Sequence, residues 1–150
     1  MSIPTGQEYM MPELGLGKIA SYQRSQVDSA AVKKDINFGQ AVQVLDDEAS
    51  PLEATGDFYG VAVAKNYVDE YTDDKVDVYK PSEAVPVLRQ GTITVIVDED
   101  VKSGEKAVVN TDTSNFLPST TAKTTKTGVI GVFKSTTSKD GLAKLEINLP

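Results

Sequence analysis

A run of alternating apolar side chains at residues 85–97 constrains the fold more than any other part of the chain. Valine, isoleucine and threonine dominate on both sides of Gln90-Gly91, which is typical of two β-strands joined by a short turn. The pattern therefore predicts a β-hairpin closed at these two residues. In that register Leu88 faces Ile93 on an apolar side of the ribbon. No side chain in the run has obvious reaction chemistry, which favours a scaffold or binding protein over an enzyme.

Shorter β-patterns follow one another through the chain from residue 36 onward. The clearest is residues 143–149, where apolar and polar side chains alternate without interruption. Further strands are expected within residues 36–45, 58–64, 76–79, 106–109 and 128–133. We therefore expect an all-β fold, a compact antiparallel β-barrel or sandwich formed by residues 36–150, with residues 1–35 as a long extended N-terminal arm.

The composition limits what such a β-protein can do. With 150 residues, of which 39% are hydrophobic, the chain fits a single domain with a modest core. A net charge of -7 and scattered lysine and arginine residues argue against a nucleic-acid partner. The sequence has neither a basic start followed by an apolar run nor about 18 successive apolar residues. We therefore expect no signal peptide, no membrane partner and synthesis in the cytoplasm of the expressing cell.

The residue types needed for most catalytic sites are missing. Cysteine and histidine are both absent, which removes thiolate metal sites, cysteine nucleophiles and the commonest general base. Acidic clusters at residues 46–48, 69–74 and 98–100 are candidate cation sites, but none has the ligand spacing of a known calcium loop. Solvated turn residues are the simpler interpretation. We expect no cofactor and no enzymatic activity.

The first 35 residues do not follow the β-pattern of the core. Two prolines and three glycines within residues 1–17 disfavour helix and strand alike. Such a segment is either disordered or ordered by a partner. Its large apolar side chains would gain free energy by binding a partner, and the candidates are Tyr9, Met10, Met11, Leu14, Leu16, Ile19 and Tyr22.

A weak internal repeat links the two halves of the core. Residues 38–44 followed by 58–62 resemble residues 103–109 followed by 129–133, with a glycine-valine pair inside the second strand of each unit. This pattern predicts two similar β-loop-β units, in which Gly60 and Gly131 mark a bulge or a close approach of two backbones. Short glycine-valine matches also arise by chance, and that alternative stays open.

Residues 110–127 form a threonine-rich stretch that is longer than usual for a structureless connection. It is interpreted as a long exposed hairpin or a functional surface. Arg89, Phe116 and Leu117 are candidate oligomer or surface contacts. A surface module that binds a receptor or a carbohydrate through this stretch, or through Tyr67 and Tyr71, is the competing function.

Several short motifs occur in a characteristic order. They are residues 11–20, Ile36-Asn-Phe-Gly-Gln-Ala-Val42, Gly60-Val-Ala62, Val85-Pro-Val-Leu-Arg-Gln-Gly91 and Val101-Lys-Ser-Gly104. In order and spacing they resemble the structural cement, or capsid decoration, proteins of tailed bacteriophages. The threonine-rich stretch and an acidic insertion at residues 67–75 depart from that family pattern.

The resemblance implies a non-enzymatic all-β protein on the outer surface of the phage head. It further implies trimers that bridge subunits of the major capsid protein and stabilise the assembled shell. The expected location is the virion, and the expected partners are the major capsid protein and two further copies of the chain.

Overall fold

The computed structural model describes residues 16–20, 25–64 and 78–150. Within these residues every regular element is a β-strand, so the expected all-β fold is confirmed. The strands are β1 (Gln26–Val32), β2 (Ile36–Asn37), β3 (Ala41–Leu45), β4 (Glu48–Pro51), β5 (Gly60–Ala62), β6 (Val78–Tyr79), β7 (Ala84–Ile96), β8 (Lys106–Val109), β9 (Phe116–Pro118), β10 (Gly131–Phe133) and β11 (Leu142–Asn148). Nine of them form one sheet, in the order β1-β4-β3-β5-β7-β11-β10-β8-β9, and β2 pairs with β6. All pairs are antiparallel except β1 with β4, which makes the large sheet mixed.

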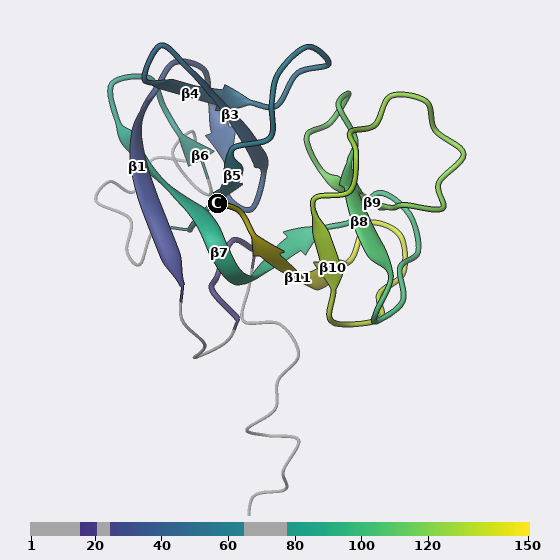
Figure 1. Ribbon diagram of the computed structural model, residues 1–150. Helices are drawn as coiled ribbons and strands as arrows, with labels where there is room; N and C mark the ends of the chain where they lie inside the picture. The colour runs from purple at the N-terminus through teal and green to yellow at the C-terminus, as the bar shows by residue number, and fades with distance from the viewer. Residues whose placement is uncertain (1–15, 21–24, 65–77) are drawn as a thin grey trace, which may run out of the picture.

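The hairpin predicted at Gln90-Gly91 is wrong, because the chain continues through these residues as the 13-residue strand β7. The first part of β7 pairs with β1 and β5, and residues 90–96 pair with β11. Gly91 has a φ of 133°, which favours glycine, and it bends the strand instead of reversing it. Strand β7 therefore spans the molecule and joins its two halves (Figure 1).

Strand β1 closes the first half of the sheet into a ring. Besides its parallel contact with β4, it pairs with β7 over Gln26–Ala31, so the pairings run β1-β4-β3-β5-β7 and return to β1. The ring encloses a core that includes Ile36, Val42 and Tyr79. The expected arm of residues 1–35 therefore included seven residues that belong to the sheet. Apolar and polar side chains do not alternate regularly along these seven residues, so they show no strand pattern. Backbone pairing with β7 holds the strand in place.

The second half of the sheet repeats the arrangement of the first. The strand neighbours β4-β3-β5-β7 correspond to β9-β8-β10-β11, and each adjacent pair in both sets is antiparallel. The predicted close approach is confirmed at both glycines. A Cβ atom on Gly60 would lie 2.4 Å from the Leu88 carbonyl oxygen, and one on Gly131 would lie 2.3 Å from the Glu146 carbonyl oxygen. The two β-loop-β units thus share the order of their strands and also a position at which a neighbouring carbonyl oxygen leaves room only for glycine.

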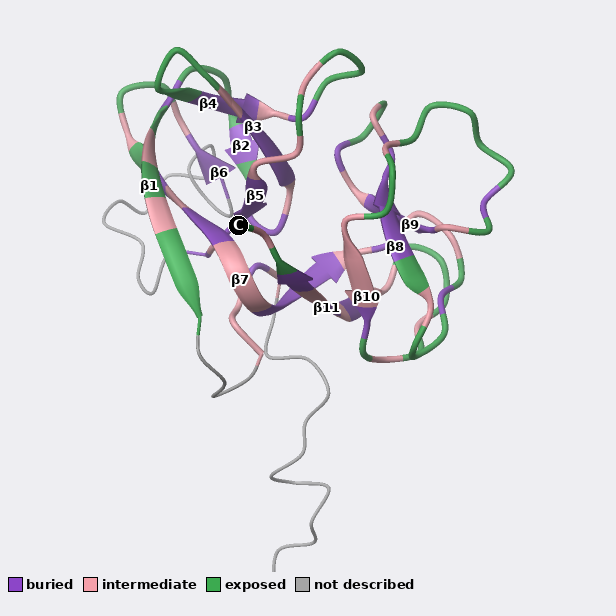
Figure 2. Cartoon of the chain, viewed as in Figure 1, coloured by how far each residue is buried: buried purple, intermediate pink, exposed green. Residues whose placement is uncertain are grey.

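The two halves are held together by a shared core. A second cluster of buried side chains runs from Ala41, Leu52 and Val61 of the first half to Phe133 and Leu145 of the second. Figure 2 shows buried segments concentrated on the strands and exposed segments on the connecting loops. Within the described residues, no helix has the length and apolar character needed to cross a membrane.

Candidate functional site

Two of the predicted arm residues pack against the protein's own core. Residues 17–20 lie along β7, where the Gly17 backbone N–H donates to the Thr94 carbonyl oxygen at 2.8 Å and Ile19 bridges to Ile93. The Leu16 side chain contacts Gly39, and both Leu16 and Ile19 are partly buried. These two side chains are thus used within the protomer. The other five predicted arm residues, Tyr9, Met10, Met11, Leu14 and Tyr22, lie outside the described residues.

Arg89, a predicted contact residue, is engaged within the chain. Its side chain is 16% exposed, and the guanidinium carbon lies 4.2 Å from the centre of the Tyr59 ring. The guanidinium donates to the Tyr59 and Pro150 carbonyl oxygens, each at 2.5 Å. The Tyr59 hydroxyl in turn donates to Asp28 at 2.8 Å, and this hydrogen bond raises the pKa of Tyr59. Arg89 therefore ties β7 to β1, to the segment before β5 and to the end of the described chain.

Phe116 and Leu117 are not surface residues of the protomer, which corrects the prediction for them. They form the first two positions of β9, and both are fully buried. The Phe116 ring meets the Phe58 ring edge to face at 6.4 Å, between the two halves of the molecule. An isolated apolar pair within a threonine-rich stretch was a signal for a short core strand.

The acidic cluster at residues 98–100 fixes three loops by accepting hydrogen bonds. Asp98 accepts from Asn110, Thr113 and Asn115 at 3.0, 2.5 and 3.2 Å. Glu99 accepts from the Thr121 hydroxyl, and Asp100 accepts from the Lys139 backbone N–H at 2.7 Å. No group of acidic side chains within the described part of the chain is arranged to hold a metal ion. The cluster thus ties together the loops around it, and four of its hydrogen-bond partners lie within residues 110–127.

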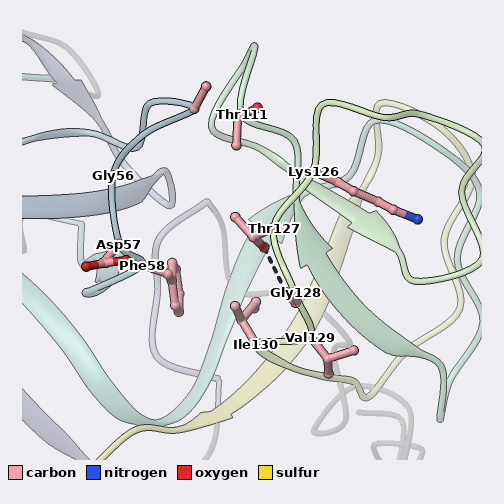
Figure 3. A pocket seen from close by; sticks show the side chains of 10 residues that line it. Gly56, Asp57, Phe58, Thr111, Lys126, Thr127, Gly128, Val129 and Ile130 are labelled. Atoms are coloured by element: carbon pink, nitrogen blue, oxygen red, sulfur yellow. Dashed lines mark hydrogen bonds between the residues drawn. The ribbon is translucent and has the colours of Figure 1, made fainter.

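A shallow cleft of about 380 Å³ opens between the two halves (Figure 3). One wall is the β4–β5 connection with Gly56, Asp57 and Phe58, and the other is residues 126–130 of the β9–β10 connection. The two connections occupy equivalent places in the two β-loop-β units. The side chain of Val129 in the second wall is 57% exposed. Polar and apolar groups are mixed along the cleft, and no pair of carboxylates lines it.

Other exposed apolar side chains lie away from the cleft. Leu45 is 61% exposed beside the tight turn Asp46-Asp47, whose residues have φ values of 52° and 66°. Val27 on β1 is 42% exposed. Sequence patterns did not identify these positions, because single apolar residues at a turn or in a polar strand carry no periodicity.

Comparison with known proteins identifies the family to which this chain belongs. The family model described as structural cement protein (E217 gp24/Pam3 gp6) matches residues 3–148. The chain belongs to the phage structural cement protein family. No curated protein sequence matches it. The membership covers both β-loop-β units, the strand that joins them and most of the N-terminal segment.

Two solved structures share the fold of this cement protein. One chain from the capsid of Myoviridae phage XM1 superposes with a TM-score of 0.72 at 18% identity, over 92% of each chain. The N base of the head fiber gp8.5 of bacteriophage phi29 superposes with a TM-score of 0.53 at 19% identity, over 83% of this chain and 95% of that one. At these identities the likeness concerns the fold alone.

Proposed function

We propose that this cement protein binds the outer surface of the assembled phage head and stabilises it by bridging subunits of the major capsid protein. The observation that carries the proposal is the match of the cement family model to residues 3–148. The fold shared with a chain of the XM1 capsid and with the phi29 head-fiber base supports it. The protein's role is structural, and we propose that it catalyses no reaction.

A physical argument links such binding to shell stability. A protein that binds the assembled shell and not the separated subunits stabilises assembly by mass action. The stabilisation grows with the number of occupied sites, so modest affinity at each site is sufficient. The two-unit sheet fits this role, because a shared core joins the two halves and the protomer presents a surface on each of them.

We assign the first 15 residues to the contact with the shell or with a neighbouring protomer. Residues 17–20 are anchored on β7, so the segment before them starts from a fixed point. Fifteen extended residues reach up to about 50 Å, enough to cross onto an adjacent molecule. We further propose a homotrimer at the threefold and quasi-threefold positions of the head.

A deletion experiment tests the proposed function and the proposed role of the first 15 residues separately. Undecorated heads are mixed with the full-length protein or with a variant lacking residues 1–15, and bound protein and the temperature of head rupture are measured. Full-length protein should bind and raise the rupture temperature, and the deletion should weaken binding. If the full-length protein does not bind intact heads, the proposed function is wrong. If the deletion variant binds equally well, only the role of the arm is wrong.

The cleft between the two halves allows a second function, receptor or carbohydrate binding, to be tested. An exposed Val129 beside a hollow between two loops is a feature that a receptor- or carbohydrate-binding module would use. Tyr67 and Tyr71, the other residues considered for this role, lie outside the described residues. Substituting Val129→Asp should leave head binding unchanged if the protein is a cement protein alone. Loss of host-cell attachment by decorated particles would instead support the receptor-binding role.

A further inference from the structure

Part of β1 presents an unpaired strand edge. Its other edge pairs with β7, and β4 covers the free edge only at Ala31 and Val32. Ser29 lies opposite Pro86, which has no N–H and whose carbonyl oxygen accepts from the Val63 N–H on the opposite side of β7. Ser29 therefore directs its own N–H and C=O away from β7, because backbone groups alternate between the two edges of a strand.

The same reasoning applies to Val27. It lies opposite Leu88, whose carbonyl oxygen faces Gly60 of β5, so this oxygen is not directed at β1. The backbone groups of Val27 and Ser29 thus form a short open ladder, two residues apart. No hydrogen bond to these groups occurs within the described residues apart from the pairing with β7.

Nothing on this edge discourages another strand. Native edges are usually blunted by lysine, proline or an inward-pointing charge, and β1 contains neither lysine nor proline. Its one charged residue, Asp28, is turned toward the Tyr59 hydroxyl and Arg89. The outward side chains are small or apolar, with Val27 at 42% exposure, and Figure 2 shows most of β1 in the exposed and intermediate colours.

We propose that this edge pairs with β1 of a second copy of the chain, antiparallel about a twofold axis through Asp28. In this register Val27 of one copy faces Ser29 of the other, and both open residues of each copy find partners. Shifting the axis to Ser29 would place Val27 against Ala31, whose edge is already covered by β4. The open ladder is thus complementary to itself in the register about Asp28, which is why a second copy is the occupant.

The small area of the proposed β1–β1 contact determines whether it forms in solution or only on the shell. Pairing along about five residues of each strand would bury far less surface than the roughly 1,200–2,000 Å² that a stable interface buries. Pairing is therefore weak for the free protein and is promoted where the shell holds copies at adjacent sites. This placement rests on the proposed function, and it differs from the threefold contact of a trimer, because it connects a copy in one trimer with a copy in the next.

Disulfide trapping tests the register directly, since the chain has no native cysteine. Single variants Val27→Cys and Ser29→Cys are oxidised separately and as an equal mixture, both on decorated heads and in concentrated solution. The mixture should form cross-linked dimers, because directly opposed Cα atoms lie about 5.5 Å apart. Neither variant alone should do so, because diagonal positions are about 7–8 Å apart, beyond the usual disulfide range.

Each other outcome overturns the proposal in a defined way. Either variant cross-linking with itself would establish a different register, and no dimer in any sample would exclude the contact. Cross-links to the major capsid protein, formed when that protein carries a cysteine, would assign the edge to the shell. Failure of the wild-type protein to bind heads would count against the proposed function, while the solution sample would still report on the edge.

A matched pair of lysine substitutions provides an independent readout. Val27→Lys places a charge on the open edge, and Val129→Lys places the same charge on an exposed valine of the other half. Val27→Lys should weaken self-association in sedimentation equilibrium by about tenfold, and Val129→Lys should not change it. Equal behaviour of the two variants would contradict the proposal.

Discussion

Removing the Asp98 carboxylate should destabilise the second half of the molecule more than removing any exposed carboxylate nearby. Asp98 accepts three side-chain hydrogen bonds, from Asn110, Thr113 and Asn115. The Asn110 side chain is 1% exposed, so in Asp98→Ala its amide would lose a partner without gaining water. A buried unsatisfied donor costs about 1–3 kcal/mol, and each of the other two hydrogen bonds is worth about 1 kcal/mol or less at partial exposure.

The expected loss for Asp98→Ala is therefore about 3 kcal/mol in the free energy of unfolding. For a chain of this length each kcal/mol lowers Tm by roughly 2–4 °C, which predicts a decrease of roughly 6–12 °C. Urea unfolding followed by circular dichroism gives the free energy, and calorimetry gives Tm. Asp112→Ala is the matched control, because Asp112 is exposed and, among the described residues, its side chain accepts a hydrogen bond from Thr125 alone. Its loss should stay within about 0.5 kcal/mol.

Two results would refute this reasoning. If Asp98→Ala loses less than about 1 kcal/mol, the carboxylate does not hold the loops together. If Asp98→Ala and Asp112→Ala lose the same amount, the effect comes from net charge and not from the three hydrogen bonds.

Further predictions follow from single contacts. Gly131→Ala should cost at least roughly 1–3 kcal/mol, because its Cβ would lie 2.3 Å from a β11 carbonyl oxygen, whereas Gly128→Ala, with nothing within 4 Å, should be nearly neutral in urea unfolding. Thr94→Val should raise stability by about 1 kcal/mol, because the buried Thr94 hydroxyl has no hydrogen-bond partner among the described residues; a loss of stability would show that this hydroxyl is satisfied. Burial raises the pKa of Tyr79 to about 12, so the stability it contributes is complete below pH of about 10 and is lost as pH rises toward 12. Tyr79→Phe should flatten this loss in unfolding experiments between those pH values, and an unchanged pH profile would contradict the assignment.

Sequence patterns predicted the strands whose two faces differ in burial. Strand β11 alternates as expected, with Ala143, Leu145 and Ile147 buried, because one face packs on the core while the other stays accessible. The shared requirement for glycine at Gly60 and Gly131 was also predictable, since glycine within an apolar strand indicates that another backbone lies too close for a side chain.

Long-range pairing was not predictable in the same way. Gln90-Gly91 satisfies the same alternation whether the chain turns or continues, and only the positions of β1, β5 and β11 decide between these outcomes. The apolar residues of strand β1 do not alternate with polar ones, so they carry no periodic signal, and its backbone pairs with β7 along most of its length.

The candidate site was predictable only in outline. Leu16 and Ile19 were predicted to bind the capsid or a neighbouring protomer, whereas the structure shows both of them packed in part against the core of their own protomer. Arg89, Phe116 and Leu117 were assigned to surface contacts because their partners, Tyr59, Phe58 and the strands around β9, are distant in sequence. The order of short family motifs carried more functional information than any single residue did.

A reconstruction of phage heads with and without this protein tests the central claim most directly. The account predicts additional density on the outer surface of decorated heads, fitted by the two-unit sheet and contacting at least two major capsid protein subunits. Heads assembled without the protein should lack this density and rupture at a lower temperature. Density for the protein inside the shell, or its absence from heads exposed to saturating protein, would contradict the account.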